Sequence, residues 1–273
     1  MTVKPVSSPD GLAWFEPERF AACGARAAFS TRAGGASSTP FDSLNLGLHV
    51  GDAEAAVLEN RRRLWSALAL DPAAPAGARQ VHGARIALAG PEDRGRGALA
   101  WSQAFEAADG LLTVERQVPL FVLGADCALL ALAAPGGSGC AAVHAGWRGL
   151  AAGIVEDGAR QLSKAAGCSP GELHAFVGAI LGEECYGVQE DFARGLEAAW
   201  GRAEAGRYLA RGESGRLGFR YAAALARRLD IAGVKPQNVE HLGHCTACRR
   251  DLFFSHRASG GHTGRMAMTV WIP

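Results

Sequence analysis

The sequence of 273 residues is poor in lysine and nearly balanced in charge. Its 28 basic residues include three lysines, Lys4, Lys164 and Lys235, which we interpret as a bias of genomic composition. The formal net charge of +1 gives the chain no general electrostatic attraction for nucleic acid or for an anionic membrane. The longest apolar run is too short, and too polar at Asp126, to span a bilayer. We therefore expect neither nucleic acid nor a membrane among its partners.

Several motifs of common enzyme classes are absent. The sequence contains no GxGxxG and no GxxxxGK[ST], which excludes the standard dinucleotide and P-loop sites. It also lacks the paired H-x-E and P-C-x-x-C signature of zinc deaminases and the G-x-S-x-G elbow of serine hydrolases. No two of its eight histidines are separated by a single residue, whereas a trinuclear copper cluster uses His-x-His pairs. A copper-dependent polyphenol oxidase is therefore disfavoured.

The cysteine count indicates a reducing compartment. Seven cysteines are an odd number, and the opening MTVKPVSSPDGLAW has no apolar signal core, so we expect a cytoplasmic protein. Cys245 and Cys248 form a CxxC beside His241 and His244, but these residues lie too close together for the usual zinc finger. A redox or partner-binding module using Cys245 and Cys248 remains a non-enzymatic alternative.

Residues 120–149 form the longest apolar run in a chain that is 48% hydrophobic. The run predicts buried strands over 120–123, 128–133 and 139–143, with turn residues at 134–138. Buried ionisable groups are costly unless they are paired, so reactive side chains here favour a site over simple packing. Four such side chains occur in the run: Asp126, Cys127, His144 and Arg148.

The spacing of two of these residues predicts a geometry. In a hairpin symmetric about Pro135 and Gly136, Cys127 would lie directly opposite His144, with Cα atoms roughly 4.5–5.5 Å apart. A thiol and an imidazole at this spacing can hydrogen-bond or bind one metal ion, and we expect their reactive atoms within about 4 Å. His82, next to Gly83, is the best third ligand for such an ion. On spacing alone, His49 and His256 are rivals.

The remaining pattern predicts a single domain, residues 1–273, of α+β type. Further strands are expected over 12–15, 27–30, 79–90, 173–181 and 266–272, and Asp52 is expected to cap a helix. A second helix is expected to begin near Trp147, so its N-terminus and Arg148 would favour an anion. Residues 30–52 predict a long functional loop, in which Arg32 offers a guanidinium to an anion.

Five motifs in this order resemble the laccase-domain (YfiH-like) family, formerly described as multicopper polyphenol oxidases. They are SLNLG at 43–47, QVHG at 80–83, GADC at 124–127, HAGWRG at 144–149 and FFSHR…TGR at 253–265. The resemblance implies a layered α/β/β/α fold with mixed sheets, similar to bacterial deamidating toxins of the CNF type. It implies phosphorolysis of adenosine, inosine and methylthioadenosine with phosphate, and some adenosine deamination. It also implies a metal site of zinc, with copper possible, on His82, Cys127 and His144.

The resulting hypothesis is a purine nucleoside phosphorylase, either a monomer or a homodimer. Its catalytic residues would be Cys127, His144, His82 and Arg148. Its substrate-binding residues would be Arg32, Asn45, Asp126, Arg257 and Arg265. The alternative is a cysteine hydrolase or amidase acting on peptidoglycan precursors, with Cys127 as nucleophile, His144 as base, and Asp126 or Asp109 orienting the imidazole.

Overall fold

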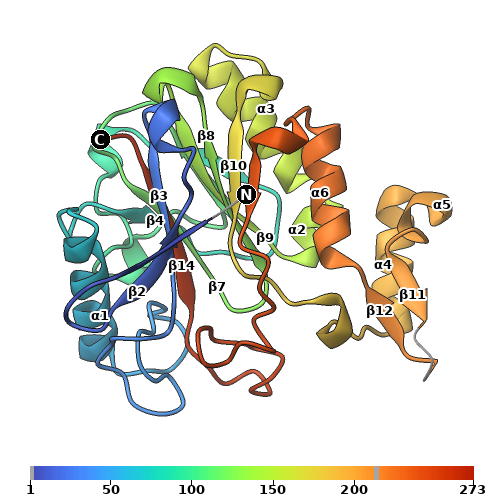
Figure 1. Ribbon diagram of the computed structural model, residues 1–273, viewed down its shortest axis with the longest axis horizontal. Helices are drawn as coiled ribbons and strands as arrows, with labels where there is room; N and C mark the ends of the chain where they lie inside the picture. Colours follow the sequence, from blue (N-terminus) through green and yellow to red (C-terminus); the bar gives the residue numbers. More distant parts are fainter. Residues whose placement is uncertain (1–2, 212–214) are drawn as a thin grey trace.

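Two six-stranded mixed sheets form the centre of the protein in a computed structural model that describes residues 3–211 and 215–273 (Figure 1). The first sheet has the order β1 (Lys4–Ser7), β2 (Ala13–Glu16), β3 (Arg26–Ser30), β14 (Met266–Trp271), β7 (Leu120–Gly124) and β4 (Ala76–Gly77). The second has the order β13 (Val239–His241), β10 (His174–Val177), β8 (Ala128–Ala133), β9 (Cys140–Ala145), β6 (Gly110–Thr113) and β5 (Ile86–Leu88). Each sheet combines antiparallel with parallel neighbours.

Helices cover the outer faces of both sheets (Figure 1). The first sheet is covered by α1 (Glu54–Ala67), and the second by α2 (Trp147–Ala151), α3 (Ile154–Ala166) and α6 (Tyr221–Ile231). A lobe projects from the side of the second sheet and contains α4 (Glu190–Trp200), α5 (Arg202–Ala205), β11 (Leu209–Arg211) and β12 (Leu217–Phe219). No helix in the described ranges is both long and apolar enough to cross a membrane.

The central strands are apolar on both sides because each sheet is buried on both faces. Along β7, Val122 packs into the core between the sheets, whereas Phe121 packs outward under α1 with Trp65. Along β8, Leu129 faces the inter-sheet core and Leu130 packs under the outer helices. Side chains alternate across a strand, so covering both faces requires an unbroken apolar run.

The structure confirms the predicted layering and most of the predicted elements, with three corrections. The strand expected over 79–90 is limited to β5, and residues 79–85 form a loop. The helix expected from Trp147 is interrupted at Gly153, whose φ of 87° is left-handed and divides it into α2 and α3. The N-cap of α1 is Ala53 rather than Asp52, whose side chain instead accepts hydrogen bonds from the preceding loop.

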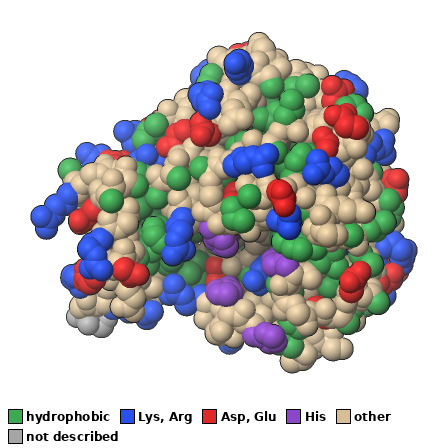
Figure 2. Space-filling view, turned by 180° about the vertical axis from the view of Figure 1, so that it is seen from behind, with side chains coloured by type: hydrophobic (Ala, Val, Ile, Leu, Met, Phe, Trp, Pro, Cys, Tyr) green, Lys and Arg blue, Asp and Glu red, His purple; other side chains and the backbone are tan. Residues whose placement is uncertain are grey.

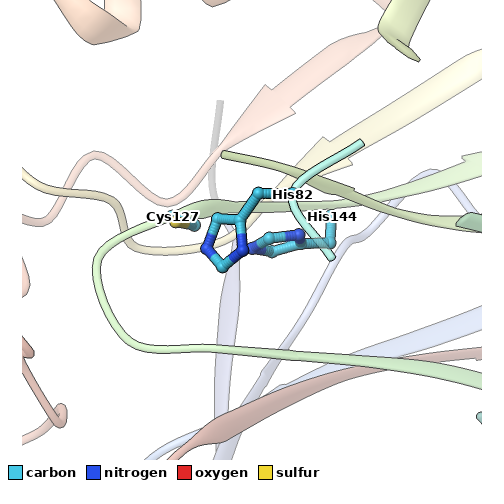
Figure 3. A group of neighbouring side chains, drawn as sticks. All are labelled: His82, Cys127 and His144. Carbon is cyan, nitrogen blue, oxygen red and sulfur yellow. The ribbon is translucent and has the colours of Figure 1, made fainter. Parts of the chain in front are cut away.

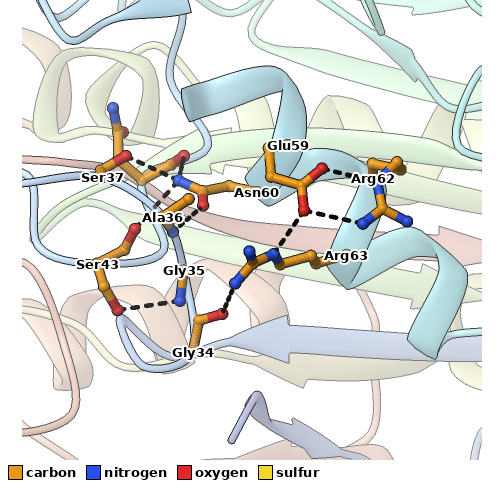
Figure 4. Close-up of polar contacts among 10 residues, drawn as sticks. Gly34, Gly35, Ala36, Ser37, Ser43, Glu59, Asn60, Arg62 and Arg63 are labelled. Carbon is orange, nitrogen blue, oxygen red and sulfur yellow. Dashed lines mark hydrogen bonds and ion pairs between the residues drawn. The ribbon is translucent and has the colours of Figure 1, made fainter. Parts of the chain in front are cut away.

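The long loop that precedes α1 is held in place by one helix side chain (Figure 4). Asn60 is fully buried and accepts a hydrogen bond from the backbone N–H of Ala36 at 2.6 Å. Its amide nitrogen donates to Ser37 Oγ at 2.8 Å, Ser43 O at 3.1 Å and Asn45 O at 2.8 Å. The segment predicted as a loop therefore has a defined backbone path, set by an amide on α1.

We expect Asn60→Ala to lower the free energy of unfolding by about 1–3 kcal/mol, because buried polar groups of the loop lose their partner. Urea denaturation of the variant measures this loss. Glu59→Ala is the matched control on the next position of the helix, because Glu59 pairs with Arg62 and Arg63 at the surface, where ion pairs contribute little. Equal stability of Asn60→Ala and the parent protein would contradict the role given to Asn60.

Candidate active site

Three side chains from separate segments converge beside the carboxyl end of β7 (Figure 3). His82 comes from the loop before β5, Cys127 from the turn between β7 and β8, and His144 from β9. One ligand atom of each lies within 4.8 Å of the others. His82 is exposed, Cys127 is half-buried and His144 is buried. The predicted convergence of the three residues is confirmed.

The pairing that produces this convergence differs from the prediction. His144 lies opposite Leu129, and Ala128 lies opposite Ala145, so Cys127 precedes the last pair of the ladder. The predicted direct opposition of Cys127 and His144 is therefore wrong by two residues. Because side chains alternate along a strand with a period of two, this shift still leaves both side chains on the same face.

The carboxylate of Asp109 orients two of the three residues. It accepts hydrogen bonds from the backbone N–H groups of Val81 at 3.1 Å, His82 at 2.9 Å and Gly83 at 2.8 Å. It also lies 2.9 Å from Nδ1 of His144. An ionised carboxylate only accepts, so Nδ1 carries a proton and Nε2 is the ring atom left to bind a ligand. Asp109 therefore fixes both the His82 loop and the tautomer of His144.

Electrostatics favour the ionised forms of Asp109, Cys127 and His144. Burial acts to raise the pKa of Asp109, but hydrogen bonds from His144 and Gly83 outweigh it and lower that pKa. Burial also acts to raise the pKa of Cys127, but the charge of His144 and hydrogen bonds with both histidines lower it to about 6. Burial acts to lower the pKa of His144, but Cys127 and Asp109 raise it to about 9. Without a metal, the site therefore favours a thiolate beside an imidazolium.

The donor atoms of His82, Cys127 and His144 fit a zinc or copper ion. Two imidazole nitrogens and one thiolate are ligands that both metals accept. The contact of the Asp109 carboxylate with Nδ1 of His144 is typical of metal-bound histidine, since it fixes the ring and raises its basicity. Three protein ligands leave one coordination position for water or substrate, as in catalytic zinc sites.

Gly146 leaves the space in which the three side chains meet. A Cβ atom at this position would lie 2.8 Å from Cδ2 of His82, 3.4 Å from Sγ of Cys127 and 3.4 Å from Cε1 of His144. The backbone angles of Gly146 are φ −60° and ψ 162°, which any residue adopts. Glycine is therefore required at position 146 because a side chain would not fit there, and not because of the backbone conformation.

The site opens into a cavity of about 370 Å³. Figure 2 shows histidine side chains gathered around a hollow in one face of the molecule, with arginine or lysine side chains close by. The volume lies within the roughly 300–1,000 Å³ typical of small-molecule pockets. Besides the three convergent residues, the polar lining comprises His49, Gln80, Asp126, Tyr186, His256, Arg257 and Arg265. His49 and His256 thus share the cavity but lie outside the convergent group.

Two of the arginines predicted to bind substrate line this cavity. Arg257 lies over the ring of Tyr186, and its Nη1 donates to Gly187 O at 2.7 Å. Arg265 donates through Nη1 to Thr263 O at 2.8 Å. Neither arginine forms an ion pair with a carboxylate in the described part of the chain. Both therefore contribute positive charge to the wall of the cavity.

The remaining predicted residues lie elsewhere or have other partners. Arg32 donates to Asp42 through Nε and Nη2 at 2.7 and 3.0 Å, and it does not line the cavity. Asn45 is fully buried, and its oxygen accepts the backbone N–H of Arg265 at 2.9 Å. Arg148 is exposed beyond the cavity lining, with its guanidinium 4.5 Å from the ring centre of Trp147.

Asp126 lines the cavity, but both of its carboxylate oxygens are engaged by the protein. Oδ1 accepts the hydroxyl of Thr246 at 2.6 Å, and Oδ2 accepts the backbone N–H of Arg257 at 2.6 Å. The carboxylate thereby ties two carboxy-terminal segments to the residue that precedes Cys127. Its contacts assign Asp126 to the support of the cavity wall.

Two supporting residues were not assigned from the sequence. Tyr221 hydrogen-bonds to Ala128 N at 2.8 Å and to Ala145 O, and so joins the ends of β8 and β9 beneath the site. Gln80 pairs with both backbone groups of Leu123, at 2.7 and 2.8 Å, and so ties the His82 loop to β7. Gln80 lies inside the QVHG motif, which was a usable signal, whereas no local pattern distinguishes Tyr221.

We expect Gly146→Ala to weaken Zn²⁺ binding at this site by at least about tenfold, because the added methyl displaces the ring of His82. Competition with a chromophoric chelator measures the affinity. Gly83→Ala is the matched control, because a Cβ there meets its nearest neighbours at ordinary distances of 3.5 and 3.6 Å. Zinc binding unchanged in Gly146→Ala would contradict the role of this glycine.

Comparisons with known proteins place the chain in a family. Residues 26–273 match the family described as multi-copper polyphenol oxidoreductase laccase. The purine nucleoside phosphorylase YlmD of Geobacillus stearothermophilus is 36% identical over 251 residues, which cover 89% of this chain and 88% of the relative. The purine nucleoside phosphorylase YfiH of Escherichia coli is 31% identical and covers 95% of this chain and 96% of its own.

A solved structure extends the similarity to the fold. The crystal structure of YlmD from Geobacillus stearothermophilus superposes with a TM-score of 0.90 at 33% identity, covering 99% of each chain. The sequence motifs, the layered sheets and the convergent His82, Cys127 and His144 thus agree with one assignment. The chain belongs to the laccase-domain family of YfiH- and YlmD-type proteins.

Proposed function

We propose that this protein is a purine nucleoside phosphorylase that acts as one catalytic unit over residues 1–273. The observation that carries the proposal is the group formed by His82, Cys127 and His144, which lines a cavity whose wall also includes Arg257 and Arg265. It is supported by relatives that are named purine nucleoside phosphorylases. The similarity of this layered fold to deamidating toxins stays a prediction of the sequence resemblance.

Phosphorolysis makes two electrostatic demands on such a site. A phosphate oxygen forms a bond to C1′ of the ribose while the bond from C1′ to the purine nitrogen breaks, and the base leaves with the electron pair. Positive charge develops on the ribose, and negative charge develops on the base. The site must therefore bind a phosphate dianion at one end and assist the leaving purine at the other.

Arginine side chains meet the first demand. Arg257 and Arg265 line the cavity and have no carboxylate partner among the described residues. Guanidinium groups bind phosphate oxygens through directed, charge-assisted hydrogen bonds. Arg148 is exposed outside the cavity lining and is a third candidate. Its positive charge acts to lower the pKa of Tyr186, which does line the cavity. Phosphate would thus bind on the arginine side of the cavity.

His82, Cys127 and His144 would meet the second demand by holding a zinc ion, or alternatively copper. Such an ion would supply a Lewis acid for the leaving purine and could activate water for the proposed side reaction, the deamination of adenosine. The chain's own contribution is positional. Asp109 holds the proton on Nδ1 of His144, and the loop it binds keeps His82 in the cavity lining. We propose adenosine, inosine and methylthioadenosine as nucleoside substrates.

A cysteine hydrolase is a second candidate, because the geometry also contains a nucleophile, a base and an orienting carboxylate. Cys127 favours the thiolate, His144 lies beside it, and Asp109 lies 2.9 Å from Nδ1 of His144. Of the two carboxylates considered for orienting the imidazole, the structure brings Asp109 to it, whereas Asp126 contacts Thr246 and Arg257. In this mechanism His82 would only line the pocket and no metal would be needed.

The two candidates differ in their dependence on phosphate and on His82. We expect adenosine and inosine to yield ribose 1-phosphate and free base only when phosphate is present, as measured by mass spectrometry. His82→Ala should lower both the zinc affinity of this site and the rate of phosphorolysis by at least about tenfold, because one of three ligands is lost. His262→Ala is the matched control, because His262 is exposed and lies outside the cavity lining.

A replacement of Cys127 distinguishes its role as a metal ligand from its role as a nucleophile. Cys127→Asp retains a potential zinc ligand but cannot form a thioester, so residual phosphorolysis with bound zinc would support the metal site. Full activity of a metal-free preparation, abolished by iodoacetamide and unaffected by His82→Ala, would instead favour the cysteine hydrolase.

A further inference from the structure

A second group of cysteines lies on the protein outside the candidate active site. Cys185 comes from the loop after β10, whereas Cys245 and Cys248 form the CxxC that follows β13. The three sulfur atoms lie within 4.8 Å of one another, and Sγ of Cys185 is 3.6 Å from Sγ of Cys248. Cys185 and Cys245 are half-buried and Cys248 is exposed. The third thiol is therefore 60 residues distant from the CxxC in sequence but adjacent to it in space.

The backbone around the group is arranged to hold Cys245. The N–H of Gly182 donates to Sγ of Cys245 at 3.1 Å. A Cβ atom on Gly182 would lie only 3.0 Å from both Cβ and Sγ of Cys245, so the close approach requires glycine. A parallel bridge pairs Ile180 with Cys245, and the N–H of Thr246 donates to Ile180 O at 3.0 Å. The two cysteine-bearing segments are thus held in a fixed register.

We propose that Cys185, Cys245 and Cys248 bind a second zinc ion through three thiolates. Two sulfurs bound to a tetrahedral zinc at about 2.3 Å lie about 3.8 Å apart, which the observed 3.6 Å between Cys185 and Cys248 approaches. A disulfide would require about 2.05 Å. Thiolates select zinc over harder cations, and the exposed side of Cys248 leaves the fourth position open to water.

This zinc would brace one wall of the cavity. Thr246, within the CxxC, donates its hydroxyl to Asp126, the neighbour of Cys127. The carbonyl of Cys185 accepts from Nη1 of Arg257 at 3.3 Å, and Arg257 lines the cavity. Binding one ion through the segments of Cys185 and Cys245–Cys248 would restrict the movement of the groups that contact Asp126 and Arg257. The proposal does not depend on which reaction the cavity catalyses.

The spacing rule for zinc fingers did not apply because the ligands are not contributed by two local pairs. The sequence alone offers Cys245 and Cys248 no suitable further zinc ligands, since His241 and His244 are too close to them along the chain. In the structure, Nδ1 of His241 accepts the N–H of Gly243 at 2.8 Å, and neither histidine belongs to the group. The third ligand instead comes from the segment that carries Cys185.

Zinc stoichiometry tests the proposal on the full chain purified under reducing conditions and equilibrated with ZnCl₂. The double variant Cys185→Ser/Cys248→Ser should contain one equivalent of zinc less than the parent protein, as measured by elemental mass spectrometry. Cys168→Ser is the matched control, because Cys168 is half-buried and belongs to neither cysteine-containing group. Cys127→Ala should retain the zinc of the three-thiolate site, so failure at the candidate active site is distinguishable from failure here.

A second variant tests the site without removing a ligand. Gly182→Ala pushes against Cys245 and should weaken the thiolate-bound zinc by at least tenfold in chelator competition, with Cys127→Ala as the background. Cobalt(II) substituted into Cys127→Ala should show thiolate-to-metal charge-transfer absorption, which the cysteine double variant removes. Equal zinc content in the parent protein and the double variant would overturn the proposal. A disulfide between Cys185 and Cys248 in reduced protein equilibrated with zinc would also overturn it.

Discussion

The buried carboxylate of Asp109 is the group on which the geometry of the candidate site depends. An anion without solvent is costly unless it is fully hydrogen-bonded, and Asp109 is completely buried. Its partners are three successive backbone N–H groups, beginning at Val81, and the ring of His144. Its own backbone oxygen accepts the N–H of His144 at 2.7 Å. Asp109, which immediately precedes β6, thus has its charge compensated by hydrogen bonds and fixes two of the three convergent side chains.

The two-sheet scaffold fixes the positions of Cys127 and His144. Sheets covered on both faces are rigid, and β8 and β9 deliver Cys127 and His144 from one hairpin while Tyr221 joins the ends of those strands. The cavity wall is built differently, from loops tied by side chains such as Asp126 and Arg257. The strand pair therefore positions two of the three convergent residues, whereas the surface that would select a substrate rests on loops, as is common in enzymes.

The sequence predicted features that depend on periodicity and on intact motifs. The apolar runs located β7, β8 and β9, and a period of two preserved the shared face of Cys127 and His144 despite the error in register. The motifs did not indicate which of their residues have partners within the protein: Arg32 and Asn45 both form hydrogen bonds to other segments of the chain. The sequence named Asp109 and Asp126 as alternative partners of the His144 imidazole, and no local pattern chose between them, because the groups that contact Asp109 come from distant segments.

If Asp109 organises a metal-binding site, replacing it with asparagine should change the zinc affinity of that site. Asparagine keeps the shape of the side chain but offers one acceptor oxygen to four donors, and its amide hydrogens face two of them. We expect Asp109→Asn to be folded, as measured by circular dichroism, and its zinc affinity at the site of Cys127 to fall by about 10–100-fold. Zinc bound with parental affinity by a folded Asp109→Asn variant would contradict it.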